Sequence, residues 1–350
     1  MSKFLIYGAN GYTGSLIAQE AIKRGMAPIL AGRHGEKLAV LATELMLDHR
    51  AFALDSPAAI DAGIRGVGAV LHCAGPFSQT WRPMADACVR VGVHYLDITG
   101  EEEVLEALAE RSGEGRAVGV VLMPGVGFDV VPTDCLAAHL KRRLPSATHL
   151  ALGFQGAAQV SRGTALTILE SLPKGGLIRE NGVLHRVSAA RRTRAIDFGT
   201  GLAKAMTIPW GDVVTAYYTT GIPNIEFYLA APWSVRVASR MSRWFGWLLG
   251  SGMVQGRLRR RVHARAAGPT AEARRRNRCW IWGEAIDAAG QKVVARLQTP
   301  DAYDLTVQTS LVAIERVLNG NVAPGFHTPA LAFGADFILD FAGVSRTDES

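Results

Sequence analysis

The sequence predicts an α/β protein in which a doubly wound parallel sheet precedes a second, α+β domain, and three observations lead to this prediction. Short apolar runs alternate with amphipathic helical patterns over the first 125 residues. A glycine-rich loop directly follows the first of these runs. From residue 148 the regular alternation gives way to strands, short helices and loops, and 350 residues are enough for about two domains.

The first domain, expected over residues 1–145, contains six predicted strands. We expect them at 3–8, 28–31, 51–54, 69–73, 94–98 and 118–123. The helical patterns between them are 12–24, 35–47, 57–65, 81–91 and 101–112. Six parallel strands are the usual number in a doubly wound nucleotide-binding sheet. Pro132 then starts a further helix, which Pro145 closes.

The second domain is expected over residues 146–321. Two β-rich runs, 279–287 and 292–299, are joined by a short turn containing Gly290 and predict an antiparallel hairpin. A helix is expected at 303–318. Because residues 330–342 are apolar with helical spacing, we expect residues 322–350 to pack back on the first domain.

The composition excludes several classes of protein. Hydrophobic residues make up 48% and charged residues 20%, which excludes a collagen or a long disordered chain. The four cysteines form no CxxC pair and have no His at ligand spacing, so we expect neither a metal site nor a disulfide framework. No signal peptide and no membrane-spanning run is apparent. These observations favour a cytoplasmic protein.

A dinucleotide-binding loop is predicted between the first strand and the first helix. It has the spacing GxxGxxG and consists of Gly8, Ala9, Asn10, Gly11, Tyr12, Thr13 and Gly14. The glycines allow a sharp turn close to a pyrophosphate, and the helix N-terminus directs N–H groups at the phosphates. Asn10 and Thr13 can add polar contacts. This arrangement is typical of a Rossmann domain, and the alternative is a glycine-rich turn that binds nothing.

The end of the second strand predicts which nicotinamide cofactor is bound. An acid about 20 residues after the last glycine binds the ribose hydroxyl of NAD, whereas an Arg accommodates the 2′-phosphate of NADP. Arg33 lies 19 residues after Gly14, and Lys37 lies one turn into the next helix. We therefore expect Arg33 and Lys37 to bind the phosphate of NADP. The alternative is a solvated basic start of a helix.

Further cofactor contacts are expected at the ends of the third and fourth strands. Asp55 can accept a hydrogen bond from the adenine amino group, or it can cap the next helix. The fourth strand ends where a doubly wound sheet places the nicotinamide. The residues expected to line it are Cys73, Ala74, Gly75, Pro76 and Phe77. Cys73 has no basic partner in the sequence pattern, so we interpret it as a core thiol rather than a nucleophile.

Two acids are candidates for acid–base catalysis. Glu101 follows the fifth strand and Asp129 follows the sixth, so both face the edge of the sheet where ligands bind. Glu101 also stands at a helix start, where an acid has a structural role. Asp129 lies in a glycine-rich loop, where it can serve as a turn residue. The sequence leaves both alternatives open.

An arginine-rich segment, residues 233–278, accounts for the basic net charge of +7. It contains 12 arginines, no lysine and one acid, Glu272, so the rest of the chain carries −4. Residues 233–249 form an amphipathic helical pattern with Trp and Phe on one side and Arg on the other. Such a helix can bind a membrane surface, here through residues 233–261, or it can dock on a core or a dimer partner. No base-reading motif accompanies it, so nucleic acid is not an expected partner.

Several stretches of the chain match a known family in order. They are 8–14 (GANGYTG), 31–38, 74–77 (AGPF), 94–101 (HYLDITGE), 124–134 (PGVGFDVVPTD), 268–303 and 325–333. Through them the chain resembles the saccharopine dehydrogenase-like NAD(P)-binding oxidoreductases, including the trans-acting enoyl reductase branch. The resemblance implies a Rossmann domain, a second α/β domain inserted before the last helix, and a substrate cleft between them. It also implies that Gly8, Gly11, Gly14 and Arg33 hold the cofactor.

The function expected from these observations is an NADP-dependent oxidoreductase. It would transfer hydride from NADPH to a C=N or activated C=C bond of a small, hydrophobic or membrane-associated substrate, with the cofactor supplying the chemistry. The resemblance leaves the substrate open, because members of the family act on imine-type adducts of amino acids and on enoyl groups. The alternative is a non-catalytic module that senses NADP and acts through a protein partner.

Overall fold

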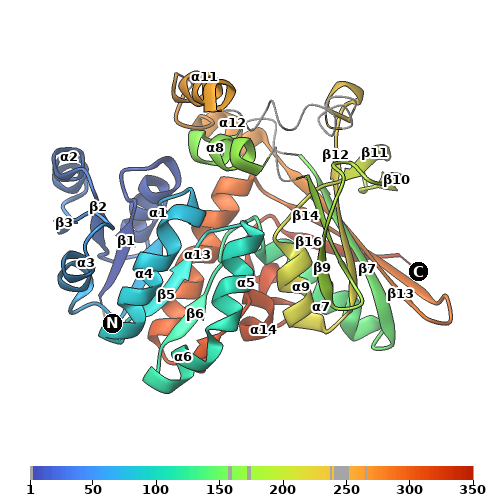
Figure 1. Ribbon diagram of the computed structural model, residues 1–350, viewed down its shortest axis with the longest axis horizontal. Helices are drawn as coiled ribbons and strands as arrows, with labels where there is room; N and C mark the ends of the chain where they lie inside the picture. The colour runs from blue at the N-terminus through green and yellow to red at the C-terminus, as the bar shows by residue number, and fades with distance from the viewer. Residues whose placement is uncertain are drawn as a thin grey trace. The chain divides into compact units, whose positions relative to one another are not determined.

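The structure is a computed structural model that describes residues 3–156, 160–171, 175–236, 239, 252–264 and 266–349. The chain divides into two compact units, each built from two segments (Figure 1). The first unit contains Met1–Asp129 and Tyr303–Ala332, and the second contains Val130–Ala302 and Phe333–Ser350.

The first unit is built on a parallel sheet of seven strands in the order β15-β6-β5-β4-β1-β2-β3. The strands are β1 (Phe4–Tyr7), β2 (Ile29–Gly32), β3 (His49–Ala51), β4 (Ala69–His72), β5 (His94–Asp97), β6 (Val121–Met123) and β15 (Gly325–Phe326). All of their pairings are parallel. The order reverses between β1 and β4, which are neighbours, with Tyr7 opposite His72. The predicted doubly wound sheet is confirmed, and its switch point lies at these two strand ends.

Helices accompany this sheet along the chain. They are α1 (Tyr12–Lys23), α2 (Gly35–Leu45), α3 (Pro57–Ile64), α4 (Phe77–Val91), α5 (Glu102–Glu110), α6 (Ser112–Val118) and α13 (Ala302–Leu318). Every residue of β1, β2 and β4 is buried. Parallel strands covered on both faces read as continuous apolar runs, which explains why the sequence pattern of these strands does not alternate.

Several elements differ from the sequence expectation, among them the sixth strand, which begins at Val121 rather than at 118, and β15, which adds a seventh strand to the expected six. The third strand pairs at His49–Ala51 rather than at 51–54. The helical pattern expected to end at 112 continues as α6 to Val118, and Gly119, at a φ of 73°, ends it. Helix α4 begins at Phe77 rather than at 81, and it continues past the internal Pro83.

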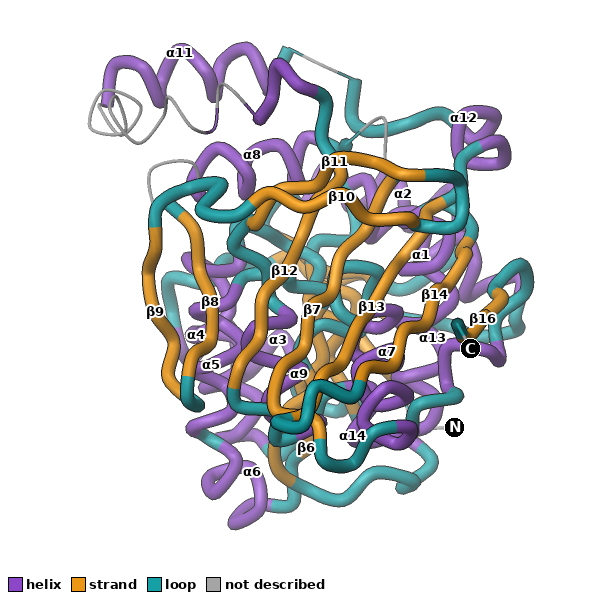
Figure 2. The backbone as a smooth tube through the Cα atoms, turned by 90° about the vertical axis from the view of Figure 1, so that its right-hand side faces the viewer, coloured by secondary structure: helices purple, strands orange, loops and turns teal. Residues whose placement is uncertain are grey.

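The second unit is built on a mixed sheet of nine strands. Seven of them follow the order β10-β11-β12-β7-β13-β14-β16, while β8 pairs with β12 and β9. The strands are β7 (Ala147–Gln155), β8 (Gly176–Glu180), β9 (Val183–Val187), β10 (Thr193–Asp197), β11 (Leu202–Thr207), β12 (Asn224–Ala230), β13 (Cys279–Asp287), β14 (Lys292–Thr299) and β16 (Ser345–Asp348). Figure 2 shows β12, β7, β13 and β14 side by side. The predicted hairpin is confirmed, with Cys279 opposite Thr299.

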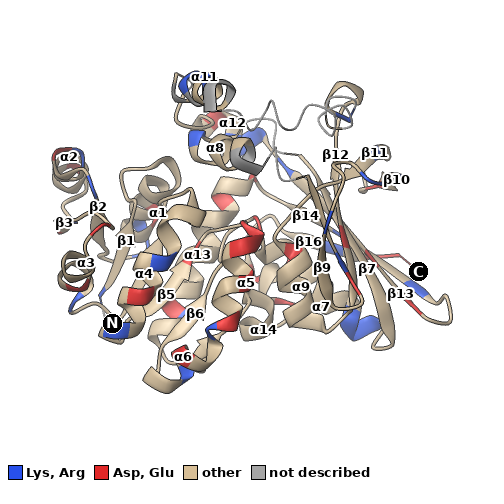
Figure 3. Ribbon diagram, viewed as in Figure 1, with Lys and Arg blue, Asp and Glu red and all other residues tan. Residues whose placement is uncertain are grey.

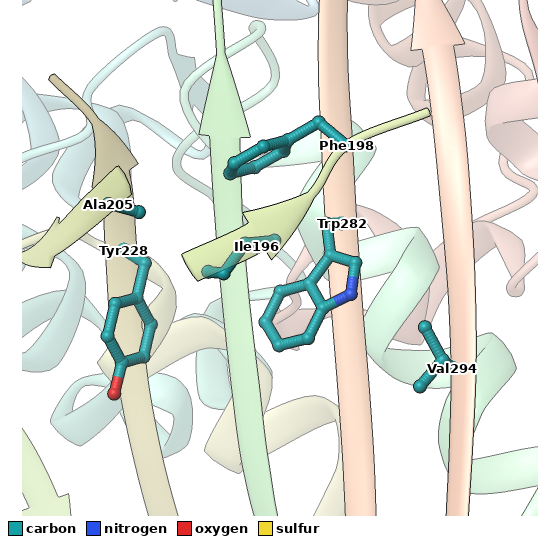
Figure 4. Packing of buried hydrophobic residues seen from close by; sticks show 6 residues of the cluster. All are labelled: Ile196, Phe198, Ala205, Tyr228, Trp282 and Val294. Carbon is teal, nitrogen blue, oxygen red and sulfur yellow. The ribbon is translucent and has the colours of Figure 1, made fainter. Parts of the chain in front are cut away.

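The two faces of this sheet are packed differently. Helices α7 (Val131–Arg143) and α9 (Asp212–Thr220) contact one face, and a Cβ at Gly283 would lie 2.7 Å from Leu140 of α7. On the sheet, a cluster of buried side chains brings β10 and β11 together with β12, β13 and β14. Its members are Ile196, Phe198, Ala205, Tyr228, Trp282 and Val294 (Figure 4).

The boundaries of the units differ from the expected positions 145 and 322. Helix α7 packs on β7, β13 and β14, so the chain from Val130 belongs to the second unit. Strand β16 pairs with β14, with Arg346 opposite Leu297, so the chain from Phe333 belongs there as well. Of residues 322–350, only those up to Ala332 join the first unit, where β15 extends the parallel sheet beside β6.

In the described part of the chain, the remaining helices are α8 (Arg162–Ser171), α11 (Gly252–His263), α12 (Ala271–Arg276), α14 (Pro329–Phe333) and the 3₁₀ helix η2 (Phe337–Asp340). Helices α11 and α12 belong to the arginine-rich segment, and Figure 3 marks their basic residues in blue. The predicted amphipathic helix 233–249 lies mostly outside the described residues. Within the described part of the chain, no helix is both long and apolar enough to cross a membrane.

Candidate cofactor site

The glycine loop forms a tight turn between β1 and α1. Gly8 has a φ of 86°, and a Cβ there would lie 2.9 Å from the Cβ of Ala74. A Cβ at Gly14 would lie 2.4 Å from the carbonyl oxygen of Gly8, which also accepts a hydrogen bond from the N–H of Gly11 at 2.9 Å. Real Cβ atoms do not approach other atoms this closely, so Gly8 and Gly14 leave no room for any other residue.

Helix α1 begins directly after this turn, at Tyr12. Gly11, with a φ of −77° and a ψ of 166°, precedes the helix, and neither a side-chain cap nor an acid is present in its described first turn. A helix start without an acidic or capping side chain keeps the positive end of the helix dipole available for an anion. The loop and the helix start therefore have the geometry of a phosphate-binding turn.

Charged side chains from the segments that follow β2 and β3 lie near Tyr7. Arg33 and Lys37 are exposed just beyond β2, and Asp55 is exposed beyond β3. The Tyr7 hydroxyl donates to the carbonyl oxygen of Phe52 at 3.0 Å. Burial raises the pKa of Tyr7 to about 12, while the Arg33 charge lowers this pKa and the Asp55 charge raises it. Both charged side chains therefore lie near the end of β1.

Asn10 lies close to β2, since a Cβ at Gly32 would be 3.5 Å from its Oδ1 atom. Tyr12 forms an edge-to-face contact with Tyr303 of α13, with ring centroids 5.0 Å apart. A residue late in the sequence, Tyr303, thus lies beside the glycine loop. Because Tyr12 and Tyr303 are far apart in sequence, no local pattern predicts this contact.

The turn after β4 lies against the glycine loop. It contains Ala74, Gly75, Pro76 and Phe77, and its Gly75–Pro76 peptide bond is cis. The Thr80 hydroxyl donates to the carbonyl oxygen of Ala74 at 2.7 Å and lies 3.0 Å from Nε2 of His72. Burial lowers the pKa of His72 to about 3, so this ring is neutral. His72 and Thr80 support the turn, a role that the sequence pattern predicts for neither residue.

Cys73 precedes this turn and is half-buried. Its Sγ atom lies 3.9 Å from the carbonyl oxygen of Leu71. Burial, followed by the charge of Asp97, raises the pKa of the thiol well above its ordinary value. A neutral thiol is a poor nucleophile, which agrees with the interpretation of Cys73 as a core thiol rather than a nucleophile.

The acids beyond β5 and β6 occupy different environments. The two carboxylate oxygens of Glu101 accept hydrogen bonds from the backbone N–H groups of Phe77, at 2.8 Å, and Ser78, at 2.7 Å. Asp129 is half-buried, and burial followed by the Glu101 charge raises its pKa to about 6. A Cβ at Gly100 would lie 3.1 Å from an oxygen of Asp129, so the two acids are close neighbours.

The structure thus brings most of the predicted site residues to the carboxyl edge of one sheet. A glycine turn at the switch point of a parallel sheet, followed by a helix start, defines a dinucleotide-binding domain of the Rossmann class. Residues 4–118 match the family model described as the saccharopine dehydrogenase NADP binding domain. The expected resemblance is confirmed, and the description of the matched family model names the expected cofactor, NADP.

Curated relatives carry names from the same family. The chain is 29% identical over 157 residues to the saccharopine dehydrogenase-like oxidoreductase of Rattus norvegicus and 30% identical over 148 residues to the trans-acting enoyl reductase of Mycobacterium leprae. These matches cover 38% and 40% of this chain, and 35% of each relative. The similarity therefore spans about a third of the length of these relatives.

A solved structure has a similar fold over the whole chain. It is the apo histidine-tagged saccharopine dehydrogenase (L-Glu forming) from Saccharomyces cerevisiae, with a TM-score of 0.67 and 11% identity over 100% of both chains. At this identity the likeness concerns the fold alone. It supports the combination of a parallel-sheet unit with a mixed-sheet unit.

Proposed function

We propose that the protein is an NADP-dependent oxidoreductase of the saccharopine dehydrogenase-like type. The observation that carries this proposal is the uncapped glycine turn at the switch point, with Arg33 rather than an acid beyond β2. Gly8, Asn10, Gly11, Tyr12, Thr13 and Gly14 would bind the pyrophosphate. Arg33 and Lys37 would bind the 2′-phosphate, and Asp55 the adenine.

The experiment that tests this assignment compares NADPH with NADH by titration calorimetry. We expect NADPH to bind at least about tenfold more tightly, since a hydrogen bond to a charged group contributes roughly 1.5–3 kcal/mol. Arg33→Ala should remove most of this preference. Lys23→Ala, at the other end of α1, removes the same charge from an exposed position and should preserve it. Equal affinities of the wild type for the two cofactors would overturn the assignment.

The proposed reaction is hydride transfer to a C=N or activated C=C bond of a small, hydrophobic substrate. NADPH supplies the hydride, and the protein orients the cofactor and provides a proton. The residues proposed to line the nicotinamide half are Cys73, Ala74, Gly75, Pro76 and Phe77. Asp129 is the proposed proton donor, because its carboxyl retains a proton at a higher pH than an ordinary aspartate.

The alternative function is a non-catalytic module that senses NADP through the first unit. The two functions differ in whether bound NADPH is consumed. Oxidation of NADPH in the presence of 2-oxo acids with amines, or of enoyl thioesters, would support the oxidoreductase. Tight binding without oxidation of NADPH by any of these compounds would favour the sensing module.

We further propose a cytoplasmic location with a peripheral membrane or homodimer contact through residues 233–261. One described residue supports such a contact: Trp233 is 71% exposed, close in sequence to Arg236. Flotation with anionic liposomes, compared between the wild type and a variant with Arg236, Arg240 and Arg243 changed to Glu, tests the membrane contact. Absence of flotation would remove the membrane contact, and light scattering then tests the homodimer.

A further inference from the structure

Two acids join the loops at the carboxyl edge of the first unit into one hydrogen-bonded chain. The chain begins at Asp97, a fully buried residue at the end of β5. Its Oδ1 atom accepts from the N–H of Thr99 and from the N–H of Gly125, both at 2.9 Å. The Tyr95 hydroxyl donates to Oδ2 at 2.7 Å. Asp97 therefore ties the loop after β5 to the loop after β6.

The chain continues to the turn after β4. The Thr99 hydroxyl oxygen accepts from the N–H of Glu101 at 3.0 Å, which fixes the start of α5. The Glu101 carboxylate then accepts from the N–H groups of Phe77 and Ser78. These are the first two N–H groups of α4, and Pro76, which precedes that helix, provides no side-chain cap. Glu101 thus caps a helix that begins 24 residues earlier in the sequence.

The capped turn is part of the wall of the proposed cofactor site. Ala74 is so close to Gly8 that a Cβ on this glycine would lie 2.9 Å from the Ala74 nitrogen. Movement of the turn would therefore change the space beside the glycine loop. Thr80, which also contacts His72, holds the turn at Ala74, and Glu101 holds it at Phe77.

We propose that Glu101 is a positioning residue, which holds the Ala74–Ser78 turn in place for the nicotinamide half of NADPH. This inference rests on the proposed function. Both carboxylate oxygens accept hydrogen bonds from backbone N–H groups of this turn. With both oxygens engaged by these N–H groups, Glu101 acts through the turn, and Asp129 remains the proposed proton donor.

The test separates the two halves of the cofactor. Calorimetry with NADPH and with adenosine 2′,5′-bisphosphate, which lacks the nicotinamide half, is carried out on the wild type, Glu101→Ala and Glu101→Gln. We expect Glu101→Ala to weaken NADPH binding by about tenfold or more, since it removes two charge-assisted hydrogen bonds. Binding of the bisphosphate should change by less than about twofold. Glu101→Gln retains one acceptor oxygen and should lie between the wild type and Glu101→Ala.

A control variant and the comparison of the two ligands distinguish a positioning role from a merely structural one. Glu103→Gln removes an exposed acid from the first turn of α5 and should leave both affinities unchanged. Equal losses for NADPH and the bisphosphate would show a merely structural role and overturn the inference, as would an unchanged NADPH affinity in Glu101→Ala. If Glu101→Ala does not fold, the same comparison in Glu101→Gln decides, because this variant keeps the size of the side chain. A wild type that binds neither compound would instead refute the proposed function.

Discussion

At the scale of a single residue, Asp129 is half-buried beside a second acid, and this environment predicts a pH-dependent contribution to stability. Burial and the Glu101 charge raise its pKa from 3.8 to about 6. The folded protein therefore binds the Asp129 proton more tightly than the unfolded chain does. Its contribution to stability is complete below about pH 4 and is lost as the pH rises through about 6.

Asp129→Asn should remove this pH dependence, because asparagine stays neutral. The free energy of unfolding, measured with urea at about pH 5 and at about pH 8, reports this pH dependence. The stability of Asp129→Asn relative to the wild type should increase by about 1 kcal/mol between these two values. Glu110→Gln, an exposed change at the end of α5, is the matched control and should follow the wild-type profile. Parallel profiles for Asp129→Asn and the wild type would contradict the assigned environment.

At the scale of elements, the β1–loop–α1 segment depends on close contact between its own glycines. Gly14→Ala places a Cβ 2.4 Å from the carbonyl oxygen of Gly8, so the backbone must move. We expect this variant to lose at least about 2 kcal/mol of stability and also to lose NADPH binding. Gly113→Ala in α6 meets no atom within 4 Å and should leave stability unchanged or raise it by up to about 1 kcal/mol. Chemical denaturation of both variants checks this contrast, and equal stabilities would contradict it.

The same segment shows what the sequence can predict. The run from Phe4 to Gly14 carries strand, turn and helix signals within a few residues of one another, so its structure was predicted closely. The hairpin of β13 and β14 is also local and was predicted with its bounds. Helix α4 was not, because its first N–H groups are satisfied by Glu101, a residue distant in sequence.

The site residues follow the same division between local and non-local signals. Gly8, Gly11, Gly14 and Arg33 could be proposed as cofactor-binding residues from the sequence, because each has a fixed position relative to a strand end. The supporting roles of His72 and Thr80 depend on a turn that folds back on its own helix, and no spacing rule describes it. The hydrogen bonds of Glu101 to the start of α4 likewise join residues that are distant in sequence, so spacing alone leaves Glu101 open between an acid and a structural residue.

At the scale of the whole molecule, the first unit is completed by a segment far along the chain. Helix α13 belongs to it, and the Thr306 hydroxyl accepts from the N–H of Phe128 at 2.9 Å, next to Asp129. The Thr309 hydroxyl donates to the carbonyl oxygen of Val126 at 2.7 Å. Residues 303–332 therefore hold the loop that carries the proposed proton donor, Asp129, although they are far from the glycine loop in sequence.

Two matched cavity variants test this division of the chain. Ile314 of α13 and Ile281 of β13 are both fully buried, one in each unit, and a change of either to Ala should cost about 2–5 kcal/mol. NADPH binding is then followed by its fluorescence as urea is raised. Because a ligand stabilises the unit that binds it, Ile314→Ala should lose NADPH at a lower urea concentration than Ile281→Ala. Loss at the same concentration would show that the two units unfold together, and later loss in Ile314→Ala would place the cofactor outside the first unit.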